Sequence, residues 1–87
     1  MTLAKAAGQF TETEIDDEVV VMSLASGDFF SLTGTARVIW LALDGQHDRA
    51  GLIAALAAEF GADPDAIAPD VDDFLARLTA AGLLTRA

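Results

Sequence analysis

Few side chains in this sequence could carry out chemistry, and their spacing does not assemble a metal site. The chain has one histidine, His47, and no cysteine. A zinc or other transition-metal site takes three or four ligands of these kinds at short spacing. His47 alone therefore predicts an ordinary surface imidazole, and we expect neither a metal nor a cofactor.

The sequence also lacks the residue combinations that nucleophilic and acid–base catalysis require. Ser23, Ser26 and Ser31 have no histidine and acid arranged with them as a triad requires. The acid pairs at residues 16–17 and 72–73 are typical of a turn and of a solvated helix face. The glycines fit turns and helix ends and form no phosphate-binding loop. We therefore expect a protein that is not an enzyme and that acts through a surface.

The best candidate for that surface is the segment 26–34. Ser26 and Gly27 are a turn signal, and the apolar residues after them predict a short strand. Thr33 is a typical N-cap residue for a helix that follows directly. The segment thus predicts a strand placed where the chain passes from strands to helices.

Length and composition limit what can surround this strand. With 87 residues, 53% of them hydrophobic, the chain suffices for one small folded domain. We expect an N-terminal tail over residues 1–8, too short and too weakly apolar for a signal peptide, and a single domain over residues 9–87. No apolar run approaches the ~20 residues of a membrane span. Together with the absence of cysteine, this predicts a cytoplasmic protein.

The charge balance restricts the partner. Fourteen acidic and five basic residues give a net charge of −9. Nucleic acids and anionic membranes are bound through clusters of Lys and Arg, so we expect neither as a partner. Five of the acids, between residues 63 and 73, crowd the start of the last predicted helix. They either steer a neutral or basic ligand there or serve only as a solvated face and as partners of the helix dipole.

Alternating and β-branched residues predict three strands, over residues 9–15, 19–24 and 28–32, joined as an antiparallel meander. The residues that we expect to face the helices are Val20, Met22, Leu24, Phe30 and Leu32. The apolar residues expected on the other face are Val19, Val21 and Phe29. An outer patch of this kind predicts a cover, which would be the N-terminal tail, a second copy or a partner enzyme.

Three helices follow the strands. We expect the first from Thr33 to a stop at Gly45, the second from a cap at Asp48 to Gly61, and the third from a cap at Asp63 to about residue 81. Pro64 fits the first position of the third helix, where its missing N–H costs nothing. The core-facing residues expected on these helices are Ala36, Ile39, Trp40, Leu43, Leu52, Ile53, Leu56, Phe60, Ile67, Val71, Phe74, Leu75 and Leu78.

The expected fold class is α+β, a three-stranded antiparallel sheet followed by three helices, arranged like a winged helix-turn-helix. A DNA-binding helix of that fold carries a basic stripe into the major groove. The last helix here exposes Asp70 and Asp73 instead. The fold alone therefore does not predict DNA binding.

The third strand offers a binding mode of its own. At the edge of a meander it presents unpaired backbone groups, which an extended peptide completes by strand addition. No Lys, Pro or bulge signal protects residues 28–32, although a loop or the tail could cover them. A stripe on the third helix, beside its core-facing one, would form the second wall of a groove. The candidate peptide-binding residues are Asp28, Phe29, Phe30, Ser31, Leu32, Ile67, Asp70, Val71, Phe74 and Arg77.

The chain resembles the PqqD-like peptide-recognition domains of ribosomal peptide natural-product pathways. The resemblance covers about residues 10–84 and rests on the order and spacing of several segments. These segments are the hairpin at residues 26–32, the stretches at 36–40, 43–45 and 56–60, and the C-terminal positions 70–71, 74–75, 78 and 82–84. The chain lacks the Trp-Asp and Leu-Leu-Ala-Pro-Glu-like segments that are associated with the family member serving pyrroloquinoline quinone synthesis. Its size is more similar to the stand-alone protein of lasso-peptide pathways.

The resemblance implies a function. It implies a non-enzymatic protein that captures the leader segment of a precursor peptide and presents it to a modifying enzyme or leader protease. Two alternatives stay open: a winged-helix transcription factor or co-regulator, and a subunit that only completes a larger enzyme.

Overall fold

The computed structural model describes residues 2–86 as two small sheets and three helices. One sheet is an antiparallel meander of β2 (Phe10–Ile15), β3 (Glu18–Ser23) and β4 (Phe29–Leu32), in that spatial order. The turns form where Asp16 and Gly27 adopt positive φ values of 54° and 76°. The expected meander is confirmed, with each strand one residue shorter than predicted or shifted by one.

Three helices follow as expected, and their N-caps, Thr33, Asp48 and Asp63, are those that the sequence indicated. They are α1 (Gly34–Leu41), α2 (Arg49–Phe60) and α3 (Pro64–Ala80). The Asp48 carboxylate accepts the N–H of Gly51 at 2.7 Å, and the Asp63 carboxylate accepts the N–H of Asp65 at 2.9 Å. Gly61 ends α2 with a left-handed φ of 62°.

A second sheet was not predicted. It consists of β5 (Asp44–His47), β1 (Leu3–Lys5) and β6 (Leu84–Arg86), with β1 in the middle and antiparallel to both neighbours. The expected tail over residues 1–8 is therefore wrong for Leu3–Lys5, because Leu3 is buried between its strand partners. Gly45 does not end the first helix, since α1 stops at Leu41 and Gly45 lies within β5. The order of strands first and helices afterwards is wrong for the same reason.

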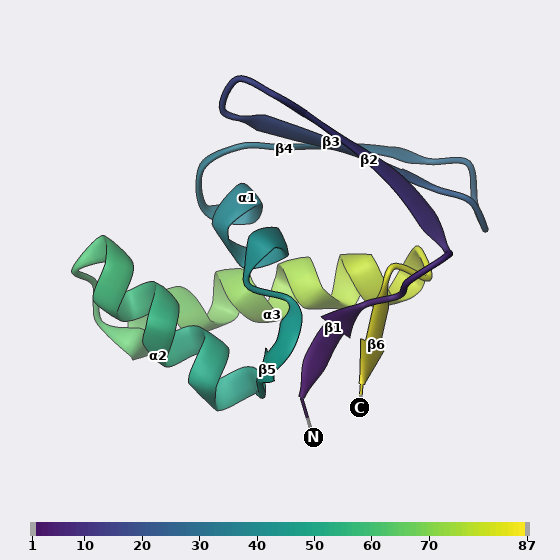
Figure 1. Cartoon of the computed structure of the whole chain (residues 1–87). Coiled ribbons are helices and arrows are strands. Elements are labelled where there is room, and N and C mark those ends of the chain that lie inside the picture. The colour runs from purple at the N-terminus through teal and green to yellow at the C-terminus, as the bar shows by residue number, and fades with distance from the viewer. Residues whose placement is uncertain (1, 87) are drawn as a thin grey trace.

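Helices α1 and α3 lie between the two sheets. Figure 1 shows the meander across one side of α1 and α3, whereas α2, the second sheet and both termini lie on the other side. Helix α3 packs against both α2 and β6. It therefore has one side facing the meander and another facing α2 and the second sheet, so that it borders two different surfaces.

Trp40 of α1 fills the centre of the core and is fully buried. Its indole Nε1 donates a hydrogen bond of 2.8 Å to Oε2 of Glu12 on β2. The Phe10 ring meets it edge to face, with 5.1 Å between ring centroids. These contacts fasten β2 to α1. Phe60, which was expected in the core, is exposed at the C-terminal end of α2.

The faces of β3 are the reverse of those expected. Val19, Val21 and Ser23 are buried against the helices, whereas Val20 and Met22 face outward. The register gives the reason: β3 and β4 pair Val19 with Leu32, Val21 with Phe30 and Met22 with Phe29. The assignment of β4 itself, with Leu32 inward and Phe29 outward, is confirmed. Apolar residues occupy both faces of β3, so alternation alone could not decide its orientation.

Candidate functional site

The edge of β4 is open in the part of the chain that the structure describes. β4 pairs with β3 on one side, and no strand within residues 2–86 pairs with its other side. The Ser23 N–H donates to the Asp28 carbonyl at 2.9 Å, which marks this pair as hydrogen-bonded across the hairpin. In an antiparallel ladder such pairs alternate, so the backbone groups of Phe30 and Leu32 point to β3. The N–H and C=O groups of Phe29 and Ser31 therefore point outward.

A hollow lies beside this edge. It has a volume of about 250 Å³ and reaches from β4 to α3 over the start of α1. Its lining residues are Phe29, Phe30, Ser31, Leu32, Ala36, Phe74 and Arg77. Phe29 is 70% exposed, whereas Leu32 and Phe74 are buried and form an apolar floor. An extended peptide added to β4 would place every second side chain over this floor.

A second hollow of about 260 Å³ continues the first between α1 and α3. Its lining residues are Thr35, Ala36, Ile39, Asp70, Asp73, Phe74 and Arg77. Ala36, Phe74 and Arg77 line both hollows, so the two are continuous. We call the combined surface, with these linings, the β4–α3 groove. It joins the open strand edge to an acidic rim on α3.

The charges of the groove come from α3. Asp70, Asp73 and Arg77 are exposed, and none of them forms an ion pair with another residue of the described range 2–86. On the strand side, the Ser31 hydroxyl donates a hydrogen bond to the Glu18 carboxylate on the outer face of the meander. The groove thus offers one guanidinium and two carboxylates next to an apolar floor, which suits a peptide with both apolar and charged side chains.

The structure brings most of the predicted site residues together. Phe29, Phe30, Ser31 and Leu32 on the strand, and Asp70, Phe74 and Arg77 on the helix, all line the β4–α3 groove. Three predicted residues do not. Asp28 lies in the turn before β4, Ile67 is half-buried against the core, and Val71 has no exposed surface. Val71 follows Asp70 on the helix, about 100° further round its axis, and packs into the core.

Sequence reasoning missed the contribution of α1. Thr35, Ala36 and Ile39 line the groove, as does Asp73 of α3. A signal was present, because only Thr33 separates β4 from α1. So short a connection keeps the first turn of the helix beside the strand edge. Ile39 was assigned to the core, and its burial agrees with that role while part of its surface closes the groove.

The described residues contain neither a metal-binding cluster nor a membrane-spanning helix. Within residues 2–86, no three His, Cys, Asp or Glu side chains gather where they could hold a metal ion. No helix in this range has the length and apolar character needed to cross a bilayer.

Comparison with known proteins decides the family. A family model described as coenzyme PQQ synthesis protein D (PqqD) matches residues 18–84, which include the meander edge, all three helices and the groove. The chain belongs to the PqqD family. The resemblance inferred from the sequence is thereby confirmed. No curated protein matches the chain.

Two solved structures of similar architecture were found. One is TbiB1 in complex with the TbiA(beta) leader peptide, at 30% identity and a TM-score of 0.79, covering 97% of this chain and 94% of that one. The other is a lasso peptide synthetase B1 complexed with the leader peptide, at 19% identity and a TM-score of 0.79, covering 98% and 99% of the two chains. The second likeness concerns the fold alone, and both agree with the α+β architecture of this PqqD-family chain.

Proposed function

We propose that this PqqD-family protein binds the leader segment of a ribosomal precursor peptide by strand addition to β4. The observation that carries the proposal is the open β4 edge, with the Phe29 and Ser31 backbone groups directed outward beside the β4–α3 groove. A peptide on this edge gains backbone hydrogen bonds from β4 and side-chain contacts from α3. The similarity to TbiB1, solved with a leader peptide, supports the same assignment.

The pathway that we propose is lasso-peptide biosynthesis. The two similar structures are proteins solved with leader peptides, and one is named a lasso peptide synthetase B1. In this role the protein is not an enzyme, and it presents the bound leader to a leader protease or another modifying enzyme. The sparse catalytic chemistry of the sequence supports this division of labour. The cytoplasmic location remains a prediction, to be tested by cell fractionation.

A winged-helix transcription factor was the alternative, and nothing in the comparisons favours it. We propose that any likeness of the α1–α2–α3 arrangement to that architecture is one of shape only. Asp70 and Asp73 on α3 would repel the phosphates of a duplex. Among the five basic residues of the whole chain, Arg77 alone lies in this groove.

The proposal is tested by titrating the purified protein into two fluorescent ligands. One is the leader of the precursor peptide encoded beside this chain, and the other is a random DNA duplex. We expect saturable binding of the leader and none of the duplex at the same protein concentrations. Binding of the duplex with no binding of the leader would overturn the proposal and restore the transcription-factor alternative.

A further inference from the structure

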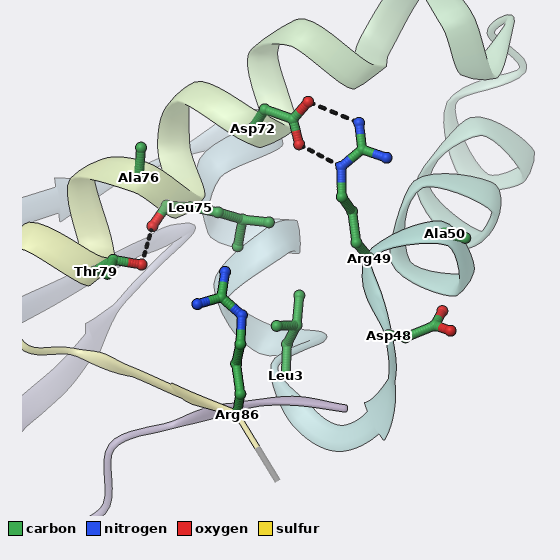
Figure 2. Close-up of a pocket in the computed structure, with 9 residues that line it drawn as sticks. All are labelled: Leu3, Asp48, Arg49, Ala50, Asp72, Leu75, Ala76, Thr79 and Arg86. Atoms are coloured by element: carbon green, nitrogen blue, oxygen red, sulfur yellow. Dashed lines mark hydrogen bonds and ion pairs between the residues drawn. The ribbon is translucent and has the colours of Figure 1, made fainter. Parts of the chain in front are cut away.

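A separate hollow lies on the other side of α3, away from the β4–α3 groove. Figure 2 shows it between the start of α2, the middle of α3 and the strands β1 and β6. Its volume is about 520 Å³. Its lining residues are Leu3, Asp48, Arg49, Ala50, Asp72, Leu75, Ala76, Thr79 and Arg86. None of them lines the groove, so this hollow, which we call the α2–α3 pocket, is a second and independent surface.

Most of the polar groups of the α2–α3 pocket are already satisfied. Arg49 holds Asp72 through two hydrogen bonds, Nε to Oδ1 at 2.6 Å and a terminal guanidinium nitrogen to Oδ2 at 2.7 Å. Their charges cancel within the wall. The Asp48 carboxylate accepts the Gly51 N–H at the start of α2 and points away from the pocket in Figure 2. The Thr79 hydroxyl donates to the Leu75 carbonyl at 2.8 Å.

Arg86 is the exception. Its side chain extends from β6 into the middle of the pocket, with its guanidinium beside Leu3 and Leu75 in Figure 2. Within residues 2–86 it forms neither a hydrogen bond nor an ion pair through its side chain. Leu3 and Leu75 are buried and give the pocket an apolar floor. A planar guanidinium that has no partner among residues 2–86 presents a fork of donors that matches a carboxylate bidentately.

We propose that the α2–α3 pocket binds a carboxylate flanked by apolar groups, as presented by an acidic residue within an apolar segment of a polypeptide partner. Arg86 binds the carboxylate, and Leu3, Leu75 and Ala76 contact the neighbouring aliphatic side chains. One guanidinium without an ion pair among the described residues suits a monoanion better than a polyphosphate, which recruits several cations. Because α3 separates the pocket from the groove, both can be occupied at once.

The test uses two capped tripeptides, acetyl-Leu-Glu-Leu-amide and its neutral match acetyl-Leu-Gln-Leu-amide, added to the isotopically labelled full chain. Amide chemical shifts report the site. We expect the acidic probe to shift the amides of Ala50, Ala76 and Thr79 and to bind about tenfold more tightly than the neutral probe. Arg86→Gln should abolish this preference. Arg37→Gln, which removes the same charge elsewhere, should keep it.

Two results would overturn the proposal: equal binding of both probes by the wild type, or an unchanged preference in Arg86→Gln. Shifts confined to the lining of the β4–α3 groove would also contradict it. The titration is repeated with the leader peptide at saturation, where we expect the affinity for the acidic probe to be unchanged. Displacement by the leader would show that the two sites are not independent. Failure of the leader itself to bind would affect only the proposed function.

Discussion

The Ser23 hydroxyl donates a buried hydrogen bond of 2.7 Å to the carbonyl of Ala81, 58 residues further along the chain. Ser23 ends β3 at the hairpin to β4, and Ala81 is the C-cap of α3. The bond thus ties the strand edge and the helix that form the two walls of the β4–α3 groove. Ser23 is also the one buried polar residue within the described range 2–86.

Removal of this hydrogen bond should lower the free energy of unfolding and leave the fold unchanged. In Ser23→Ala the Ala81 carbonyl is left buried without its partner, so we expect the free energy of unfolding to fall by about 1–3 kcal/mol. Urea denaturation measures the change. Ser26→Ala, at an exposed position of the same hairpin, is the control and should change stability by about 0.5 kcal/mol or less. Equal effects of the two substitutions would contradict this role for Ser23.

The outward N–H of Ser31 permits a sharp test of strand addition. Ser31→Pro removes that N–H, and proline is tolerated on the open side of an edge strand. We expect the variant to fold and to bind the leader at least about tenfold more weakly, because the backbone bond is lost and the ring blocks the edge. Ser31→Ala is the matched control, since it also loses the hydroxyl bond to Glu18 but keeps the N–H. Similar leader affinities of the two variants would count against backbone pairing at this residue.

The acidic rim of the groove should strengthen leader binding through its charge. We expect Asp70→Ala to weaken leader binding by about fivefold at low salt, the size of an exposed ion pair or hydrogen bond. The difference should shrink near 0.5 M salt, where the Debye length is about 4 Å. Glu59→Ala removes an equal charge from the exposed face of α2 and serves as the control. An equal loss in both variants would mean that net charge matters and the position of Asp70 does not.

The ion pair across α2 and α3 gives a pH prediction. Hydrogen bonding by Arg49 lowers the pKa of the Asp72 carboxyl from its ordinary value. Because the folded-state pKa is the lower one, this stabilisation is present above the unfolded-state pKa and is lost as the pH falls through the folded-state value. Arg49→Gln should therefore raise the Asp72 titration midpoint, measured by NMR, and weaken the acid dependence of stability. An unchanged midpoint would show that Arg49 does not govern this carboxyl.

Local signals in the sequence predicted the three helices, their N-caps and the end of α2, but not the end of α1. Asp48, Asp63 and Gly61 cap helices because their side chains or backbone freedom act within a few residues. The meander and its open edge were also predictable, since turn residues separate the strands. Most of the groove followed from these elements, because a strand edge and a helical stripe can be read from short-range periodicity.

The rest depended on contacts between distant residues. β1, β5 and β6 are three or four residues long and exist only because they pair with one another across the whole chain. The orientation of β3 was misjudged because both of its faces are apolar and only pairing with β4 distinguishes them. Val71 was predicted both as a core residue and as a site residue, and its complete burial agrees with the core. Thr35 entered the groove only through the packing of α1.

Amide exchange along β4, with and without the leader peptide, tests the central claim most directly. The structure predicts an alternating response, because Phe30 and Leu32 already donate to β3 whereas the N–H groups of Phe29 and Ser31 point outward. Leader binding should slow exchange at Phe29 and Ser31 and leave the other two nearly unchanged, as measured by NMR. Unchanged exchange at Phe29 and Ser31 with a saturating leader, and protection appearing elsewhere, would contradict strand addition to β4.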